Sequence, residues 1–293
     1  MHADELDIDA ALVRRLLVEQ FPRWADLPLK RVASSGTDNA IFRLGSEMLV
    51  RLPRIERVAG SIEHERKCLL RLAPFLPVAV STPLAKGSPT DFYPCDWAVY
   101  DWLKGENPVV GSIVDPGGLA SDLAGFIHAF WRIDPTDGPP KKQTLIMRDE
   151  QVQKDFRALE NRIDLEIARL VWRDALKLPH WSATPVWVHG DLAPGNLLLA
   201  DHRLVGVIDF SGAGVGDPSV DMQLAWNLLP ANARPIFRKK VGADDATWLR
   251  ARARSLAQAL VQLPYYWNTN RVLAANARHV IAEISAEARD EFR

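Results

Sequence analysis

The sequence contains little cysteine, no long apolar run and no excess of charge of either sign. The 293 residues include two cysteines, Cys68 and Cys95, which form no metal-binding or redox motif, so we expect reduced thiols in a cytoplasmic protein. No apolar run reaches the roughly 18–20 residues that a membrane-spanning helix needs. The acidic start is atypical of a secretory signal peptide. The net charge of −1 indicates neither a nucleic-acid nor a membrane partner.

The remaining composition is that of an ordinary globular protein, with 47% hydrophobic and 25% charged residues. Apolar spacing predicts a helix, three strands, a second helix and a buried strand, over 9–20, 29–33, 40–44, 47–52, 58–72 and 97–102. After Gly105 the pattern becomes mostly helical, over 118–132, 149–175 and from about 219 onward, with short strands within 186–210. We therefore predict an α+β fold with two lobes. Residues 1–103 form a small antiparallel sheet with one main helix, and residues 104–293 form a larger, mostly helical lobe.

The most informative stretch is His189-Gly190-Asp191-Leu192-Ala193-Pro194-Gly195-Asn196, followed by Val207-Ile208-Asp209-Phe210. This is the spacing of a kinase catalytic loop and metal loop. Kinases use one Asp to accept the proton of an attacking hydroxyl, and an Asn and a second Asp to hold Mg²⁺ on the nucleotide phosphates. Two loop aspartates that merely cap helices are the alternative, but they would not require this spacing.

With Gly216-Asp217-Pro218 and Asp221 further along, these motifs resemble the aminoglycoside phosphotransferase family, the small-molecule branch of the protein-kinase-like fold. The resemblance covers about residues 30–230. It implies that Asp191 accepts or orients the substrate hydroxyl proton, and that Asn196 and Asp209 bind Mg²⁺. It also implies ATP or GTP as the phosphoryl donor and a nucleotide-binding role for residues 1–103.

Three neighbouring positions are given supporting roles. We expect His189 to be structural, because Asp191 already serves as the base. Asp217 is expected to cap the helix that begins near Pro218, and the resemblance implies that the segment through Asp221 braces the catalytic loop. Gly190 stands where protein kinases have an Arg that often serves phosphorylation of an activation loop, which suggests an enzyme without that switch.

The nucleotide lobe departs from the kinase pattern twice. Ser35, Gly36 and Thr37 replace a glycine-rich loop, and a plain hairpin turn is the alternative reading of that stretch. Arg51 stands where kinases have the Lys that grips the phosphates, and the two side chains are not interchangeable. Because Glu65 falls on the apolar face of the next helix and needs a cation, we predict an Arg51–Glu65 ion pair.

The strand over 97–102 resembles the hinge between kinase lobes. The resemblance implies that backbone groups of Asp101 and Leu103 contact the purine edge. It also implies that Ile208 forms the lower wall of the base pocket. Contacts to backbone groups do not distinguish ATP from GTP.

Three functions remain open at this point. The first is phosphotransfer to a hydroxyl of an aminoglycoside or macrolide antibiotic; the second is a metabolite kinase for an amino alcohol or sugar; the third, suggested by Arg51, is a nucleotide-binding pseudokinase. Asp191, Asn196 and Asp209 together favour an enzyme, but the fold alone does not specify the acceptor. Carboxylates on 149–160 would suit a polycation, and Trp226 with 265–267 would suit a macrolide, although a solvated helix face and core packing explain them equally well. We expect a monomer or a weak homodimer.

Overall fold

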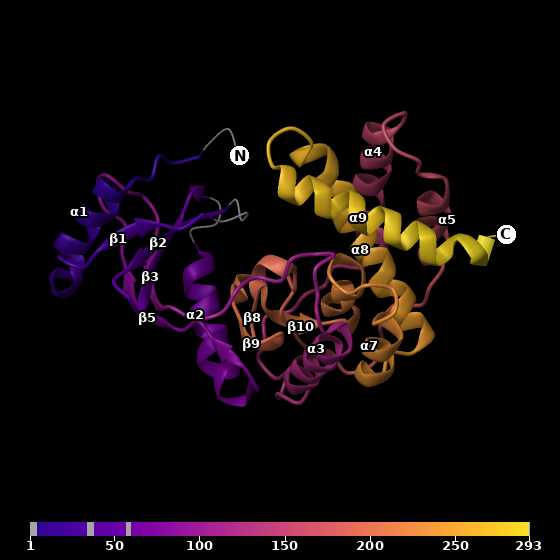
Figure 1. The fold of residues 1–293 in the computed structure, drawn as a ribbon, viewed down its shortest axis with the longest axis horizontal. Helices are drawn as coiled ribbons and strands as arrows, with labels where there is room; N and C mark the ends of the chain where they lie inside the picture. Colours follow the sequence, from indigo (N-terminus) through magenta and orange to yellow (C-terminus); the bar gives the residue numbers. More distant parts are fainter. Residues whose placement is uncertain (1–4, 34–37, 57–59, 293) are drawn as a thin grey trace.

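The computed structural model describes residues 5–33, 38–56 and 60–292. It shows a twisted N-terminal sheet with helices beside it, next to a larger helical part (Figure 1). The predicted α+β fold, with an antiparallel N-terminal sheet and a helical C-terminal part, is therefore confirmed. The division into 1–103 and 104–293 as separate functional lobes stays a prediction.

In the described residues the N-terminal sheet has five antiparallel strands in the order β1-β2-β3-β6-β5. These are β1 (Leu29–Arg31), β2 (Asn39–Leu44), β3 (Met48–Pro53), β5 (Pro83–Gly87) and β6 (Trp97–Asp101). β2 buries every second residue, whereas β3 buries four in succession because it is covered on both faces. α1 (Ala10–Gln20) packs on one face and α2 (Ser61–Leu72) on the other, which fixes the inner strand that carries Arg51.

The predicted N-terminal elements are present with shifted ends. The first strand ends at Arg31 rather than residue 33, and the helix predicted over 58–72 is described only from Ser61. β5 escaped prediction because it is a partly exposed edge strand with Lys86 among its residues. Cys68 and Cys95 are both buried and free, in agreement with the reduced thiols expected of cysteines outside any metal-binding or redox motif.

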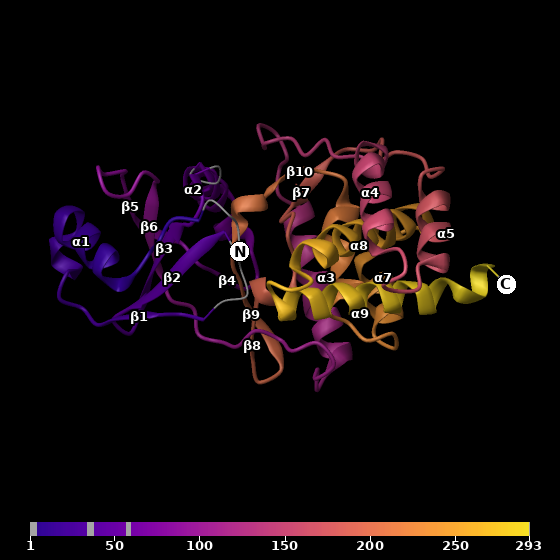
Figure 2. The same ribbon diagram turned by 90° about the horizontal axis from the view of Figure 1, so that it is seen from above.

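Two small sheets connect the N-terminal sheet region to the helical part. β4 (Ala79–Val80) pairs in parallel with β9 (Arg203–Val207), which pairs with β8 (Leu197–Ala200) in antiparallel. β7 (Val186–Val188) pairs with β10 (Gly214–Gly216). Figure 2 shows these strands between the N-terminal sheet and the helices. The catalytic loop therefore leaves one small sheet and enters the other.

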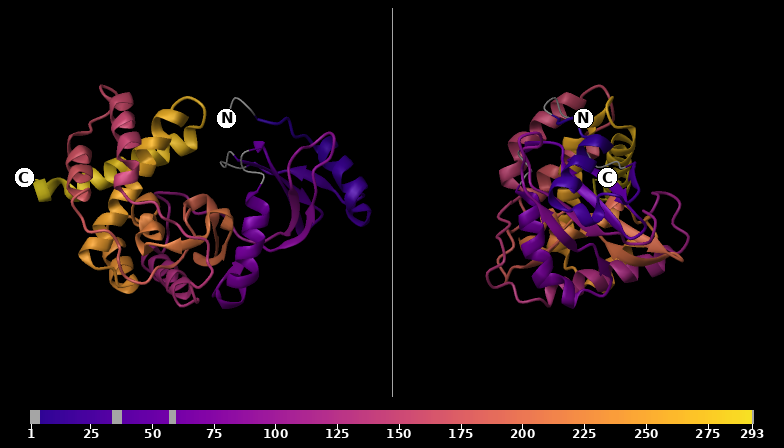
Figure 3. Two further views of the ribbon diagram at one scale, coloured as in Figure 1. Left: turned by 180° about the vertical axis from the view of Figure 1, so that it is seen from behind. Right: turned by 90° about the vertical axis from the view of Figure 1, so that its left-hand side faces the viewer.

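The helical part is organised around one long helix, α8, which packs against α4, α5 and α9 (Figure 3). Its helices are α3 (Pro116–Trp131), α4 (Asp149–Leu159), α5 (Glu166–Ala175), α6 (Leu224–Asn227), α7 (Arg234–Val241), α8 (Asp245–Tyr266) and α9 (Arg271–Ala288). Short 3₁₀ turns are η1 (Pro22–Trp24), η3 (Ala73–Phe75), η4 (Ile146–Arg148), η5 (Pro194–Asn196), η6 (Phe210–Gly212), η7 (Pro218–Gln223) and η8 (Arg289–Phe292). Within the described ranges, none of the helices is long and apolar enough to cross a membrane.

The prediction of one helix over 149–175 was wrong. α4 ends at Leu159 and α5 begins at Glu166. Asn161 has a φ of 63°, a left-handed conformation that asparagine tolerates and that a helix cannot continue through. Asp164 then accepts a hydrogen bond from the backbone N–H of Glu166 at 3.0 Å, which favours the start of a new helix. The apolar spacing continues across the break and so conceals it.

Candidate active site

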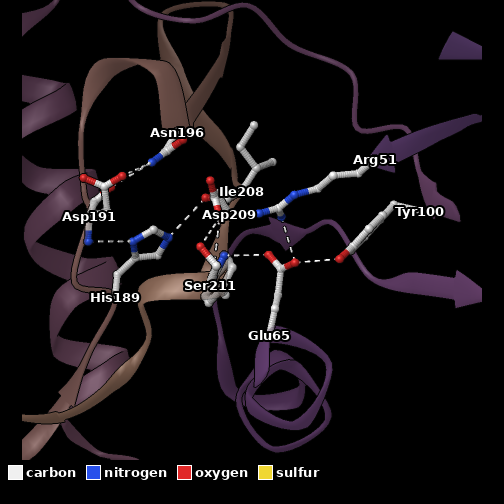
Figure 4. A network of polar contacts seen from close by, with 10 residues as sticks. Arg51, Glu65, Tyr100, His189, Asp191, Asn196, Ile208, Asp209 and Ser211 are labelled. Atoms are coloured by element: carbon white, nitrogen blue, oxygen red, sulfur yellow. Dashed lines mark hydrogen bonds and ion pairs between the residues drawn. The ribbon is translucent and has the colours of Figure 1, made fainter. Parts of the chain in front are cut away.

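The catalytic loop is a tight turn that places Asp191 beside Asn196 (Figure 4). It leaves β7 at Val188 and ends in η5, directly before β8. Asn196 Nδ2 donates to the Asp191 carbonyl at 2.8 Å and to Asp191 Oδ2 at 3.2 Å. The proposed base and a proposed metal ligand are therefore held together by the loop itself.

Asp221 holds the start of this loop through two hydrogen bonds. Its carboxylate accepts the backbone N–H of His189 at 2.7 Å and that of Gly190 at 2.8 Å. Gly190 has a φ of +88°, which only glycine adopts readily, so the turn requires glycine at this position. Burial raises the pKa of Asp221 to about 6, although the two N–H donors favour its charged form. The expected bracing of the catalytic loop by Asp221 is confirmed.

Asp217 makes contacts of a different kind. It accepts the backbone N–H of Ser219 at 3.0 Å and so caps η7, as predicted. Its other oxygen pairs with Arg250 at 3.0 Å and with Arg254 at 3.3 Å, both on α8. Asp217 thus links the segment after the metal loop to the central helix.

His189 is fully buried and neutral. Burial lowers its pKa to about 4. Its Nε2 lies 3.1 Å from the Ile208 carbonyl, so this nitrogen carries the proton, and its Nδ1 accepts the Asp191 N–H at 3.3 Å. The ring also meets Phe210 edge-on. These contacts tie the catalytic loop to the metal loop, as expected for a structural histidine.

Asp209 lies at the end of β9, between the catalytic loop and the N-terminal sheet. Its φ is 64°, a left-handed conformation, and its Oδ1 accepts the Ser211 hydroxyl at 2.6 Å. The same Oδ1 pairs with Arg51 Nη2 at 2.9 Å. Burial opposes ionisation of Asp209, but the Arg51 charge and the Ser211 hydrogen bond together lower its pKa.

The predicted Arg51–Glu65 ion pair is present, with Arg51 Nη1 2.8 Å from Glu65 Oε2. Both side chains are buried. Burial alone would lower the pKa of Arg51, but the charges of Asp209 and Glu65 raise it well above its usual range. Arg51 therefore remains a cation and joins β3, α2 and the metal loop.

Glu65 is the centre of this network and has two further donors that the sequence did not reveal. Tyr100 Oη donates to Oε2 at 2.6 Å, and the Phe210 backbone N–H donates to Oε1 at 2.8 Å. Tyr100 lies on β6 beside β3, and only its place in the strand predicted over 97–102 hinted at the contact. The Arg51–Asp209 pair was also not predicted.

The charge of Asp191 is set by its neighbours. Burial and the negative charge of Asp209 raise its pKa, Asn196 and Lys141 oppose the rise, and the net value is about 6. A carboxyl group with a pKa near the working pH is suited to accept a proton from a hydroxyl.

The residues proposed as metal ligands fit Mg²⁺, which prefers oxygen ligands and takes few of them from the protein. Within the residues described, Asn196 Oδ1 and Asp209 Oδ2 take part in no hydrogen bond. No described cluster of three or more His, Cys, Asp or Glu side chains forms a metal cage. Two protein oxygens would suit a Mg²⁺ ion whose other ligands include phosphate oxygens of the nucleotide.

The other nucleotide-binding predictions are not tested by these contacts. Ser35, Gly36 and Thr37 lie outside the described residues. The backbone N–H of Asp101 donates a hydrogen bond to the Thr82 carbonyl at 3.3 Å, and the Asp101 carbonyl accepts one from Ser81 Oγ at 3.0 Å. Its role in contacting a purine, and those of Leu103 and Ile208, stay predictions.

Comparison with known proteins agrees with this geometry. Residues 30–256 match the model of the phosphotransferase enzyme family. An aminoglycoside 3'-phosphotransferase of Escherichia coli is 33% identical over 79 residues, which cover 26% of this chain and 29% of the relative. The matched stretch therefore spans less than a third of that relative.

Two solved structures share the fold over almost their whole length. The GDP complex of aminoglycoside 2'-phosphotransferase-IIIa superposes with a TM-score of 0.76 at 16% identity, covering 96% of this chain and 99% of that one. The macrolide 2'-phosphotransferase MphH from Brachybacterium faecium has a TM-score of 0.65 at 20% identity, covering 94% and 97%. The chain belongs to the phosphotransferase enzyme family and has the fold of its aminoglycoside and macrolide phosphotransferases.

Proposed function

We propose that the protein transfers the γ-phosphoryl group of ATP or GTP to a hydroxyl of a small molecule. The observation that carries the proposal is the convergence of Asp191, Asn196 and Asp209 in one network with a buried cation, Arg51. Membership of the phosphotransferase enzyme family and the GDP bound to the structural relative support it.

In the proposed reaction the acceptor hydroxyl approaches Asp191. The oxygen of the acceptor hydroxyl forms a bond to the γ-phosphorus, and the bond from that phosphorus to the β–γ bridging oxygen breaks. The proton of the hydroxyl passes to the Asp191 carboxylate. Asn196 and Asp209 would hold Mg²⁺, which neutralises charge on the phosphates when bound. Glu65 and Asp209 hold Arg51 in place, and we propose that its guanidinium contacts phosphate oxygens of the bound nucleotide.

We propose an antibiotic of the aminoglycoside or macrolide type as the acceptor, supported by the names of the relatives. The α4 carboxylates that would suit a polycationic aminoglycoside are partly engaged within the protein. Asp149 accepts Trp172 Nε1 at 2.7 Å, and Asp155 is buried and bonded to Gln151. These contacts occupy oxygens of two carboxylates that would otherwise be open to the ammonium groups of an acceptor.

The turn between α8 and α9 offers another kind of surface. The guanidinium groups of Arg162 and Arg278 lie 4.8 and 4.2 Å from the ring centroid of Trp267. α9 reaches the catalytic loop through Asn227, which accepts a hydrogen bond from Asn276 and donates one to the Leu192 carbonyl. This turn therefore presents an aromatic ring and two cationic groups. Trp226, in contrast, is fully buried and packs in the core.

The experiment is transfer of label from γ-labelled ATP and GTP to a panel of aminoglycosides, macrolides, amino alcohols and sugars. We expect Mg²⁺-dependent labelling of at least one macrolide or aminoglycoside, lost in Asp191→Asn. Labelling of an amino alcohol or sugar alone would support the metabolite kinase instead. Nucleotide binding without transfer to any acceptor or to water would indicate a pseudokinase.

A further inference from the structure

A lysine outside the catalytic motifs lies against the catalytic loop. The segment that carries it runs beside β10, because Val215 N donates to Pro139 O and Lys141 N donates to Val215 O, both at 2.8 Å. β10 in turn pairs with β7, the strand that leads into the catalytic loop. The backbone of Lys141 is therefore fixed relative to that loop.

Three glycines make room for the Lys141 side chain. A Cβ added to Gly216 would lie 3.1 Å from Lys141 Cβ, and one added to Gly214 would lie 2.9 Å from Lys141 Cγ. A Cβ added to Gly190 would lie 2.3 Å from Lys141 Nζ, closer than any real contact. The stem thus extends past β10, and its ammonium group occupies the space that a side chain at position 190 would enter.

The ammonium group is surrounded by charges of the catalytic loop and its brace. Burial lowers the pKa of Lys141, while Asp221 and Asp191 raise it. Its other charged or titratable neighbours include Arg254, Cys68 and His189. Among the described residues no carboxylate lies within ion-pair distance of Nζ, so the charge acts on both aspartates and is committed to neither.

We propose that Lys141 is a positioning residue for Asp191, supplying from a neighbouring segment the cation and the bulk that Gly190 lacks. Asp191 and Asp221 are two acidic groups that flank one tight turn, and a cation beside that turn offsets their mutual repulsion. The inference rests on the proposed phosphotransfer. Lys141 also precedes α4 and α5 in the chain, so it connects the segment that carries these helices to the catalytic loop.

The first test compares Lys141→Met with Lys141→Arg and with Lys142→Met, a matched control because Lys142 is the exposed neighbour. The kcat is measured for phosphoryl transfer to the labelled acceptor or, where no acceptor is known, for the slow Mg²⁺-dependent hydrolysis of the nucleotide by water. The affinity for the Mg²⁺·nucleotide complex is measured separately by calorimetry. We expect Lys141→Met to lower kcat by up to about a hundredfold, the loss that a misplacement of about 1 Å causes. Nucleotide affinity should remain within about twofold, because Arg51, Asn196 and Asp209 are unchanged. Lys141→Arg should recover part of the loss.

Wild-type kcat in a folded Lys141→Met protein, or an equal loss in Lys142→Met, would overturn the proposal.

The second test needs no turnover and no Lys141→Met protein. The pKa of Lys141 is measured by NMR of isotope-labelled lysine side chains in wild-type protein and in Asp221→Asn. We expect Asp221→Asn to lower that pKa further, because one of two carboxylates that stabilise the ammonium is gone. An unchanged pKa would also overturn the proposal, whereas a lowered pKa in a protein without any phosphotransfer would refute only the proposed function.

Discussion

Arg51 and Lys141 are cations on two sides of the same acidic site, and the protein holds them in opposite ways. Arg51 is paired at 2.8 Å with Glu65 and at 2.9 Å with Asp209, and these charges raise its pKa. Lys141 has no ion pair of this kind in the described chain, and burial lowers its pKa. Arg51 joins β3, α2 and the metal loop, whereas Lys141 offsets negative charge around the turn of the catalytic loop. We therefore expect loss of Arg51 to affect stability and nucleotide use, and loss of Lys141 to affect turnover.

The largest effect is expected at Asp191, whose carboxylate is influenced by Lys141 and by Asp209, the partner of Arg51. Asp191→Asn is nearly isosteric, so the fold and nucleotide affinity should persist while turnover falls by roughly 10²–10⁴, the loss typical for a general base. Steady-state kinetics with a labelled acceptor measures it. Asp201→Asn, at an exposed turn, serves as the control. Turnover close to that of the wild type would remove Asp191 from the mechanism.

The Arg51 network is tested next by a double-mutant cycle. Arg51→Ala leaves the buried Glu65 without its cation and should cost about 3–5 kcal/mol of unfolding free energy. Glu65→Ala should cost less, because Arg51 keeps its ion pair with Asp209. The double variant should lose less than the sum of the two singles. Urea unfolding measures all four proteins.

The matched control for this cycle is the partly exposed pair Glu63–Arg66 on α2, the helix that carries Glu65, at 3.0 Å. Its coupling is expected to be at most about 1 kcal/mol because solvent screens it. Strict additivity of Arg51→Ala and Glu65→Ala would show that the buried pair does not form in solution.

Asp209 belongs both to the Arg51 network and to the proposed metal site. Asp209→Ala removes the carboxylate proposed to face Mg²⁺, so the gain in nucleotide affinity on adding Mg²⁺ should fall by roughly tenfold or more, about 1.4 kcal/mol. Ser211→Ala removes a 2.6 Å hydrogen bond but keeps the carboxylate, and should preserve that gain. Calorimetry with and without Mg²⁺ distinguishes them. Equal Mg²⁺ dependence in wild type and Asp209→Ala would make Asp209 purely structural.

The sequence predicted the site where the contacts are local or lie on one face of an element. Asp191 and Asn196 are five residues apart in one turn, and Glu65 was found because an apolar helix face cannot bury a carboxylate without a cation. The Arg51–Asp209 and Tyr100–Glu65 contacts were missed because they join residues 158 and 35 positions apart, and only the packing of β3, β6 and α2 brings them together. Lys141 was missed for the same reason, since its site is formed by glycines on other segments.

The smallest expected effect is that of Tyr100→Phe, which removes one hydrogen bond at the edge of the Arg51 network. Glu65 would keep Arg51 and the Phe210 N–H as donors, so the loss of unfolding free energy should be about 1 kcal/mol. Because Glu65 orients Arg51, a modest rise in the KM for the nucleotide should accompany that loss. Urea unfolding and steady-state kinetics measure the two effects.

Tyr93→Phe is the matched control for this change. Tyr93 is a second buried tyrosine, and its hydroxyl donates to the Pro53 carbonyl at 2.7 Å. Its loss should cost similar stability and leave the KM unchanged, because Pro53 lies outside the Arg51 network. If the two variants had the same KM, the hydroxyl of Tyr100 would contribute to the fold but not to the orientation of Arg51. The orientation of Arg51 would then depend on Glu65 and Asp209 alone.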